Sequence, residues 1–171
     1  NTFGNAGTEI TEPSTFNNTN IASAALSAAG ITPGGNTNRF GGSTWAVGTI
    51  DTGKYIEFTV TPNAGWAFTL SSLDFIWDFS GSGPKSLAIR SSVDGYTTNL
   101  LALTNMTASA SAVKSVVIPS LINITSSTTL RIYGYDATAT GGTGGFDTST
   151  NAPNVTLYGK TLPAPTAAVI S

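Results

Sequence analysis

The chain has 171 residues, of which only 9% are charged, and seven Lys and Arg against nine Asp and Glu give a net charge of −2. A chain of this length fits one domain with its own core. Because no stretch is rich in Lys and Arg, nucleic acid and anionic membranes are poor candidates as partners. Cys and His are both absent, which excludes thiol and imidazole catalysis and the common zinc sites.

The sequence also bears on location. No run approaches the roughly 20 apolar residues of a membrane span, and neither a charged-then-apolar leader nor an initiator Met is present. We therefore expect a processed, exported protein that is extracellular or on the cell surface. Without Cys, its stability must come from sheet and core rather than from disulfides.

The first predicted elements lie in the N-terminal half. Residues 21–30, "IASAALSAAG", fit either one short helix or an early strand, because they are rich in Ala but interrupted by Ser. Residues 55–62, "YIEFTVTP", alternate apolar and polar side chains and predict a half-buried antiparallel strand. Residues 68–80, "FTLSSLDFIWDFS", predict a strand pair or one bent strand, with Leu73, Phe75, Trp77 and Phe79 on its apolar face.

The second half continues in the same way. "SLAIRSSVDGY" (86–96) predicts a strand followed by a turn at Asp94-Gly95. "AVKSVVIP" (112–119), "TTLRIYGYDA" (128–137) and "NVTLYGK" (154–160) predict further strands. Eight or so short strands predict an all-β fold, an antiparallel β-sandwich of jelly-roll type, over residues 1–160.

Residues 161–171, "TLPAPTAAVIS", form a predicted tail beyond this domain. Pro163 and Pro165 favour an extended backbone, and Val169 and Ile170 are β-branched and uncharged. Such a segment is a candidate donor strand for a neighbouring subunit.

The order of "FGNAGTEITEPSTF", "YIEFTVTP", "IRSSVDGY" and "RIYGY", followed by "NVTLYG", resembles a β-sandwich module of secreted bacterial proteins. Such modules occur in Bacteroidetes, cyanobacteria and planctomycetes, commonly ahead of a C-terminal sorting or anchoring signal. The resemblance runs from about residue 3 to residue 159. It departs from the module in two ways: "TSTNAP" is inserted between Asp147 and Asn154 of the usual "FDNVTL" signature, and the tail lacks a recognisable sorting motif. The resemblance implies a fold similar in outline to carbohydrate-binding jelly rolls, but it implies no assigned activity.

Catalysis is not expected from these residues. Without His or Cys, an enzyme would need paired carboxylates or Ser-Lys chemistry. Asp74 and Asp78 share a strand face, but the strand rise separates them by roughly 13 Å, which is too far for a retaining glycosidase pair. We therefore predict a protein that is not an enzyme.

Metal binding rests on four loop carboxylates. A jelly roll often holds a structural Ca²⁺ where its first and last strands meet, and Ca²⁺ takes oxygen ligands. The candidates are Glu9, Glu12, Asp136 and Asp147. The alternative is that all four are solvated, and no other cofactor is expected.

Carbohydrate binding needs aromatic platforms flanked by polar groups. Among the Trp and Tyr residues, Trp77 is predicted to be core and Trp45, in "GGSTWAVG", to be the freest Trp. Arg131, Tyr133 and Tyr135 share one strand face, and a shallow polyol-binding patch results if Arg90 lies beside them. The alternative is an ordinary outer face on which Arg stems cover the rings.

Assembly is the third function considered. So few charges leave little repulsion between copies and few charged residues to protect sheet edges. The sequence favours a non-enzymatic structural protein that forms a homopolymer (a filament, sheath or surface layer) by strand addition. The alternative is a carbohydrate-binding accessory module of a secreted polysaccharide-active protein.

Overall fold

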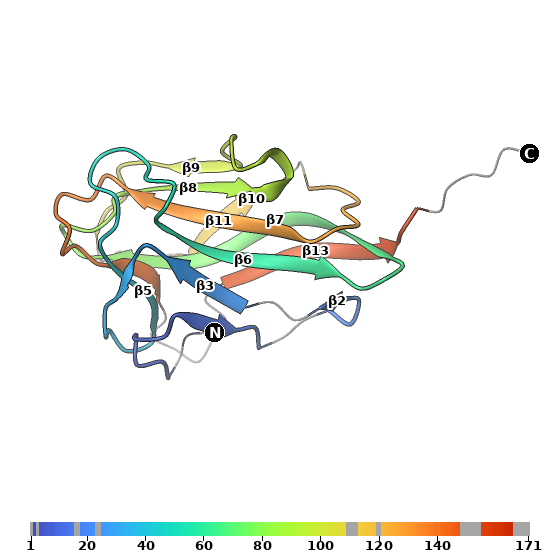
Figure 1. Ribbon diagram of the computed structural model, residues 1–171, viewed down its shortest axis with the longest axis horizontal. Coiled ribbons are helices and arrows are strands. Elements are labelled where there is room, and N and C mark those ends of the chain that lie inside the picture. Colours follow the sequence, from blue (N-terminus) through green and yellow to red (C-terminus); the bar gives the residue numbers. More distant parts are fainter. Residues whose placement is uncertain are drawn as a thin grey trace, which may run out of the picture.

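A computed structural model describes residues 2, 4–15, 18–22, 25–108, 113–118, 121–147 and 155–165. Two antiparallel sheets stack into a β-sandwich, which confirms the predicted all-β class (Figure 1). In this part of the chain the helical segment is a single 3-10 turn, η1 (Ser92–Asp94). None of the described segments is a helix long and apolar enough to cross a membrane.

The first sheet has β6 and β11 at its centre, and both are eight residues long. Its order is β1 (Thr11–Pro13), β3 (Ala25–Ala29), β6 (Tyr55–Pro62), β11 (Thr128–Tyr135), β8 (Ser86–Ser91) and β9 (Leu101–Leu103). The two-residue β2 (Ile21–Ala22) pairs with the end of β6. Residues 21–30, open between helix and strand in the sequence, therefore supply two strands.

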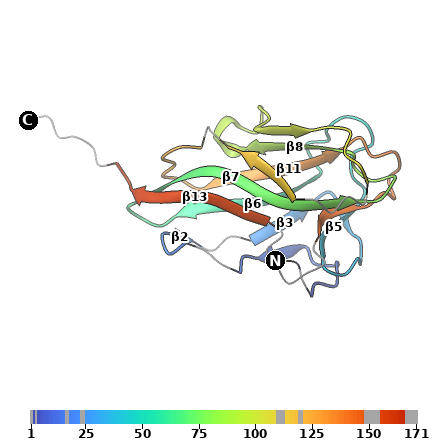
Figure 2. The same ribbon diagram turned by 180° about the vertical axis from the view of Figure 1, so that it is seen from behind.

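The second sheet is organised around β7 (Trp66–Phe79), the longest strand of the fold (Figure 2). Its order is β10 (Val113–Val117), β7, β12 (Gly144–Asp147), β5 (Arg39–Ser43) and β4 (Thr32–Pro33). The last strand, β13 (Val155–Pro163), also pairs with β7.

The core lies between the sheets and is built by the alternation seen in the sequence. Ile56, Phe58 and Val60 of β6 are buried, while the residues between them are half-buried. The inner face of β7 adds Leu73, Phe75, Trp77 and Phe79, as predicted. Burial of these large apolar side chains is the main stabilising contribution to such a fold.

The strand β7 changes its inward phase once. Phe68 and Leu70 are buried, and then, after Ser71 and Ser72, burial resumes at Leu73 and every second residue beyond it. The register of β13 shifts between Tyr158 and Gly159, opposite the same point. One extra residue in an antiparallel pair is a β-bulge, so residues 66–79 form one irregular strand rather than a strand pair.

The strands β12 and β13 follow one another along the same side of β7. Phe146 of β12 lies opposite Trp77, and Val155 of β13 lies opposite Phe75. β13 lies on the side of β7 away from β10, because β10 and β13 pair with the same stretch of β7. β12 lies on that side as well. The insertion noted in the sequence thus falls between two consecutive segments that pair with the same side of β7. Residues 148–154 themselves lie outside the described residues.

The sandwich extends past the predicted boundary at residue 160. Thr161, Leu162 and Pro163 continue β13 opposite Phe68, Ala67 and Trp66, and the N–H of Ala164 donates to the carbonyl of Gly65 at 2.8 Å. Pro163 and Pro165 have no N–H to donate, which explains why regular pairing stops here. The start of the predicted tail is therefore the end of the last strand.

Candidate functional site

The outer face of the first sheet carries a row of charged side chains across its three central strands. Glu57 of β6 lies opposite Arg131 of β11, and Arg131 lies opposite Arg90 of β8. Along the row, one negative charge is followed by two positive charges, and the two arginines lie side by side. This is the shared sheet surface that the sequence hypothesis required of Arg90 and Arg131.

Arg131 is held on three sides. Its Nε donates to Oε2 of Glu57 at 2.9 Å, and its guanidinium carbon lies 4.1 Å from the ring centroid of Tyr55 and 4.0 Å from that of Tyr96. Burial disfavours the charged guanidinium, but the hydrogen bonds to Glu57 and then to Tyr133 outweigh burial and raise the pKa of Arg131 above its usual value. The side chain is therefore charged at every accessible pH and has little freedom to move.

Arg90 has no carboxylate partner in the described part of the chain. Its Nε donates to Oδ1 of Asn99 at 2.7 Å and its Nη1 to the carbonyl of Tyr96 at 3.2 Å. Its guanidinium carbon lies 5.5 Å from the ring centroid of Tyr133. The charge of Arg90 is thus oriented by neutral groups but is not neutralised by them.

Tyr96 connects the two arginines and has an unusual backbone. Its φ is +63°, a left-handed value that is uncommon for a bulky side chain. Its N–H donates to the carbonyl of Ser91 at 2.9 Å, and the carboxylate of Asp94 accepts from the N–H of Thr98 at 2.9 Å. Hydrogen bonds from the Thr98 side chain and from the N–H groups of Thr98 and Thr97 lower the pKa of Asp94. The turn between β8 and β9 therefore places the Tyr96 ring over Arg131.

The aromatic residues predicted for sugar binding fall in different places. The prediction that Trp45 is the freest Trp is wrong: it is 0% exposed, and its Nε1 donates to the carbonyls of Gly42 and Gly144 at 2.9 and 3.2 Å. The Gly-rich segment around it lets the backbone approach the ring rather than exposing the ring. Tyr133 lies on the predicted face but is only 1% exposed, and Tyr135 is half-buried further along β11.

Sequence reasoning did not select four members of this cluster: Glu57, Tyr55, Tyr96 and Asn99. Tyr55 and Glu57 alternate outward along β6, and this signal is present in "YIEFTVTP". Their position beside Arg131 depends on the register between β6 and β11, which are separated by more than 60 residues in the sequence. Tyr96 and Asn99 lie in a turn, and the path of a turn cannot be predicted from the hydrophobic periodicity of the sequence.

The predicted calcium ligands do not gather in one place among the described residues. Glu9 accepts from the N–H groups of Ala6 and Gly7 at 2.9 and 2.8 Å, and Glu12 accepts from Nδ2 of Asn5 at 2.8 Å. Burial acts to raise the pKa of Glu9, but these and other backbone hydrogen bonds lower it overall. The first two predicted ligands thus bond to the N-terminal loop.

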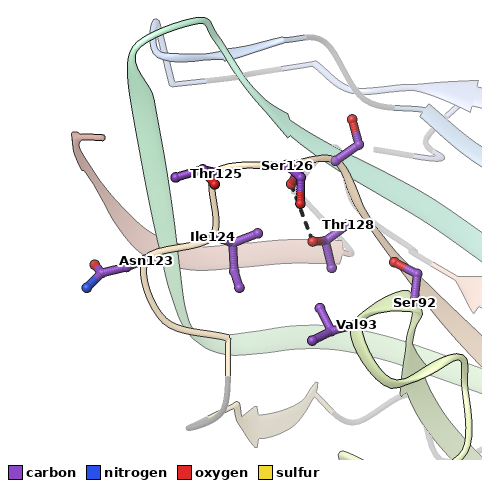
Figure 3. Close-up of a pocket in the computed structure, with 8 residues that line it drawn as sticks. Ser92, Val93, Asn123, Ile124, Thr125, Ser126 and Thr128 are labelled. Atoms are coloured by element: carbon purple, nitrogen blue, oxygen red, sulfur yellow. Dashed lines mark hydrogen bonds between the residues drawn. The ribbon is translucent and has the colours of Figure 1, made fainter. Parts of the chain in front are cut away.

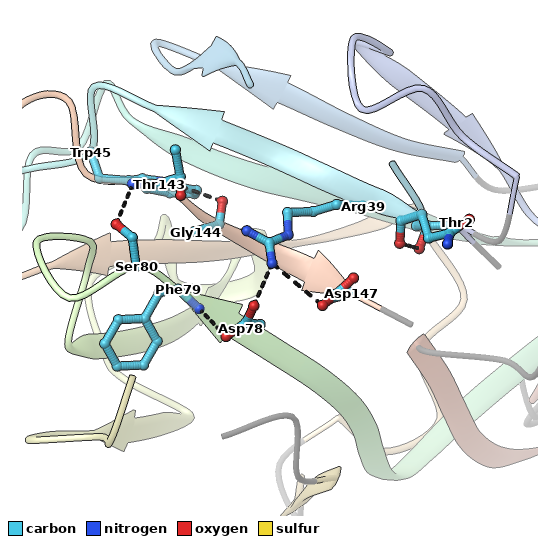
Figure 4. A network of polar contacts seen from close by, with 10 residues as sticks. Thr2, Arg39, Trp45, Asp78, Phe79, Ser80, Thr143, Gly144 and Asp147 are labelled. Carbon is cyan, nitrogen blue, oxygen red and sulfur yellow. Dashed lines mark hydrogen bonds and ion pairs between the residues drawn. The ribbon is translucent and has the colours of Figure 1, made fainter. Parts of the chain in front are cut away.

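Asp147 and Asp136 lie on separate elements. Asp147 lies near Arg39, with 3.4 Å between its Oδ2 and Nη2, and the same Nη2 contacts Asp78 (Figure 4). Asp136 is exposed at the end of β11, where its N–H donates to the carbonyl of Gly48. Across the described ranges, no three carboxylates come together as a metal-binding group.

A shallow hollow lies between η1 and the loop before β11 (Figure 3). It has a volume of about 410 Å³ and is lined by Ser, Thr and Asn side chains with Val93 and Ile124. None of its lining side chains is an acid or a base at neutral pH, so the side chains of this hollow act only as neutral hydrogen-bonding and apolar groups.

The strand β13 supplies the second candidate surface. Within the described ranges its backbone pairs with β7 alone, and its side chains Tyr158, Lys160 and Leu162 are exposed. The side chain of Thr161 contacts Asn18 and Asn20. Of the residues predicted for subunit contact, Pro163 ends β13 and Pro165 is exposed, whereas Val169 and Ile170 lie outside the described residues.

No protein-family model matches this chain, and no curated protein is significantly similar to it in sequence.

Proposed function

We propose that this chain is a non-enzymatic extracellular structural protein that assembles into homopolymers by strand addition. The observation that carries the proposal is β13, a nine-residue strand at the border of the second sheet. Unpaired strand edges are the sites at which sheets accept strands from other chains.

The first half of β13 is the better acceptor. Residues 155–158 carry no charge and precede the register shift at Gly159, whereas the second half contains Lys160 and ends in Pro163. Charges, bulges and Pro are the features that blunt a sheet edge. Charges in particular are few, since only 9% of the residues of the chain are charged.

The donor proposed is the segment "TAAVIS", residues 166–171, which follows directly from Pro165. An edge on one subunit and a donor on another form a heterologous contact, and such contacts produce open polymers when the rotation does not close a ring. The resemblance to modules of secreted bacterial proteins supports an extracellular location for the polymer.

Two deletions test this proposal. A chain that lacks residues 166–171 should stay folded but form no filaments by electron microscopy. A chain that lacks residues 161–171 should also lose stability, because it removes three paired residues of β13. Filaments formed by the shorter deletion would contradict the donor role of this segment.

A carbohydrate-binding module is the second candidate function, and one observation favours it. Arg90, Arg131 and Tyr133 share one sheet face as the sequence hypothesis required, with Tyr55 and Tyr96 beside them. Affinity for a polysaccharide that is lost in Tyr96→Ala, measured on a polysaccharide-containing gel, would support this function.

A further inference from the structure

We infer that the Arg90–Arg131 pair binds the anionic groups of an acidic polysaccharide, either carboxylates or sulfate esters. The inference rests on the second function proposed above and names its ligand class. It is carried by the charge balance of the row, by the fixed positions of both guanidinium groups, and by the aromatic rings around them.

The positive charges of the row exceed its negative charges. Like charges placed directly opposite one another on neighbouring strands are destabilising, and here Arg131 is directly opposite Arg90. Glu57 neutralises Arg131, while Asn99 and the Tyr96 carbonyl leave the charge of Arg90 in place. A bound anion would remove this repulsion, so the row favours an anionic ligand over a neutral one.

The positions of the two guanidinium groups are fixed before any ligand arrives. Arg131 lies between two Tyr rings and bonds to Glu57, and Arg90 is fixed by two hydrogen bonds. Binding a ligand to side chains that are already ordered loses less conformational entropy. The left-handed backbone of Tyr96 belongs to the same arrangement, and strained residues of this kind cluster at functional sites.

The shape of the site selects a polymer rather than a small molecule. Arg90 and Arg131 lie side by side on the outer face of the first sheet, where both are half-buried and the Arg131 side chain keeps 24% of its surface exposed. Guanidinium groups pair with carboxylate and sulfate oxygens through parallel hydrogen bonds, and the half-buried rings of Tyr55 and Tyr96 lie beside them at the same surface. A chain of acidic sugars would lie along the face and gain from repeated weak contacts.

The test compares three glycans on the full-length protein. Alginate carries carboxylates, and dextran sulfate carries sulfate esters. Unmodified dextran is the neutral control for dextran sulfate. We expect alginate or dextran sulfate, but not dextran, to bind, with an affinity that falls as salt rises. Loss of one charge-assisted contact in Arg90→Gln should weaken binding about tenfold, and Arg90→Lys should retain part of it.

Two controls separate this site from general charge effects. Lys114→Gln removes one positive charge from β10 in the other sheet and should leave binding unchanged. A single-stranded oligonucleotide should bind more weakly than the better acidic glycan. Thermal unfolding followed by circular dichroism should show that Arg90→Gln is folded.

Three results would overturn the inference: dextran bound as tightly as both acidic glycans, Lys114→Gln as damaging as Arg90→Gln, or an oligonucleotide bound as well as the acidic glycan. The first of these would leave the second function in place and change only its ligand. Absence of binding to all three glycans would contradict the inference, and binding to other neutral polysaccharides would then decide whether the second function stands. Filament formation, scored on the same samples, reports separately on assembly, because β13 belongs to the other sheet.

Discussion

Trp45 and Trp77 meet edge to face between the two sheets, with ring centroids 5.6 Å apart and planes inclined at 69°. Trp77 comes from the inner face of β7, and Trp45 from the segment that follows β5. The indole N–H of Trp45 donates to carbonyls of β5 and β12, so one side chain joins the apolar core to the backbone of two strands.

The first prediction concerns the stability of this pair. Trp45→Ala should lower the free energy of unfolding by about 3–5 kcal/mol, because it leaves a cavity and removes the donor for two buried carbonyls. Urea denaturation measures the loss. Trp66→Ala, at a half-buried position at the start of β7, should lose less. A stable Trp45→Ala protein would contradict the buried position of this ring.

The second prediction uses the glycine that faces Trp45. A methyl group at Gly134 would lie 2.8 Å from Cε3 of Trp45 and 3.1 Å from Cβ of Pro84. Gly134→Ala should therefore lower the free energy of unfolding by about 1–3 kcal/mol through overpacking. Gly141→Ala is the matched control, because no atom lies within 4 Å of its added methyl group. Equal stability of the two variants would show that the space around Gly134 can expand.

The sequence predicts this fold best where alternation is strong. The inward residues of β6 and the second half of β7 follow from period-two patterns that any half-buried strand must show. The phase change at Ser71 and Ser72 does not follow from such a pattern, because a bulge is a local departure from it. Trp45 was misplaced for a related reason. It follows Gly, Ser and Thr residues, and its burial depends on distant partners such as Gly144.

The candidate site was predicted in part. The shared face of Arg131 and Tyr133 follows from their spacing along one strand, but the place of Arg90 beside them depends on register. Pairing register is set by long-range packing and turn geometry, which one sequence does not display. Arg131 lies between two aromatic rings because the turn between β8 and β9 places Tyr96 over it, and the sequence does not show the path of this turn.

The third prediction concerns the ion pairs of Arg39. This side chain contacts Asp78 and Asp147, and all three side chains are at most 21% exposed. Arg39→Met should lower the free energy of unfolding by about 2–4 kcal/mol, because two poorly hydrated carboxylates then face one another without a cation. Lys54→Met breaks the more exposed pair with Asp51 and should change stability by less than about 1 kcal/mol. Chemical denaturation of both variants at low salt compares them, and equal losses would contradict a special role for Arg39.

The fourth prediction concerns pH and the turn that carries Tyr96. The pKa of Asp94 is lowered by hydrogen bonds from Thr98 and Thr97, so folding favours its charged form. The stabilisation of the turn is therefore complete above the unfolded-state value of 3.8 and is lost as pH falls through the lower folded value. Amide and ring resonances of Thr97, Thr98 and Tyr96 should shift together in an NMR titration below pH 4. Asp94→Asn should remove this titration, and resonances that move equally in the variant would contradict it.

The last prediction concerns the uncharged half of the β13 edge. Tyr158 is 48% exposed, and the aliphatic stem of a lysine can cover part of the surface that the ring covers, so Tyr158→Lys should lower the free energy of unfolding by less than about 1 kcal/mol. The added charge would be desolvated if a second chain paired along residues 155–158, and a lysine at a sheet edge opposes such pairing. Filaments counted by electron microscopy should therefore become rare in this variant. Val93→Lys is the matched control, since it places the same charge at an exposed apolar residue of η1, far along the chain from β13. If both variants form filaments like the parent protein, subunits do not meet at β13, and if both lose them, the added charge acts through general repulsion.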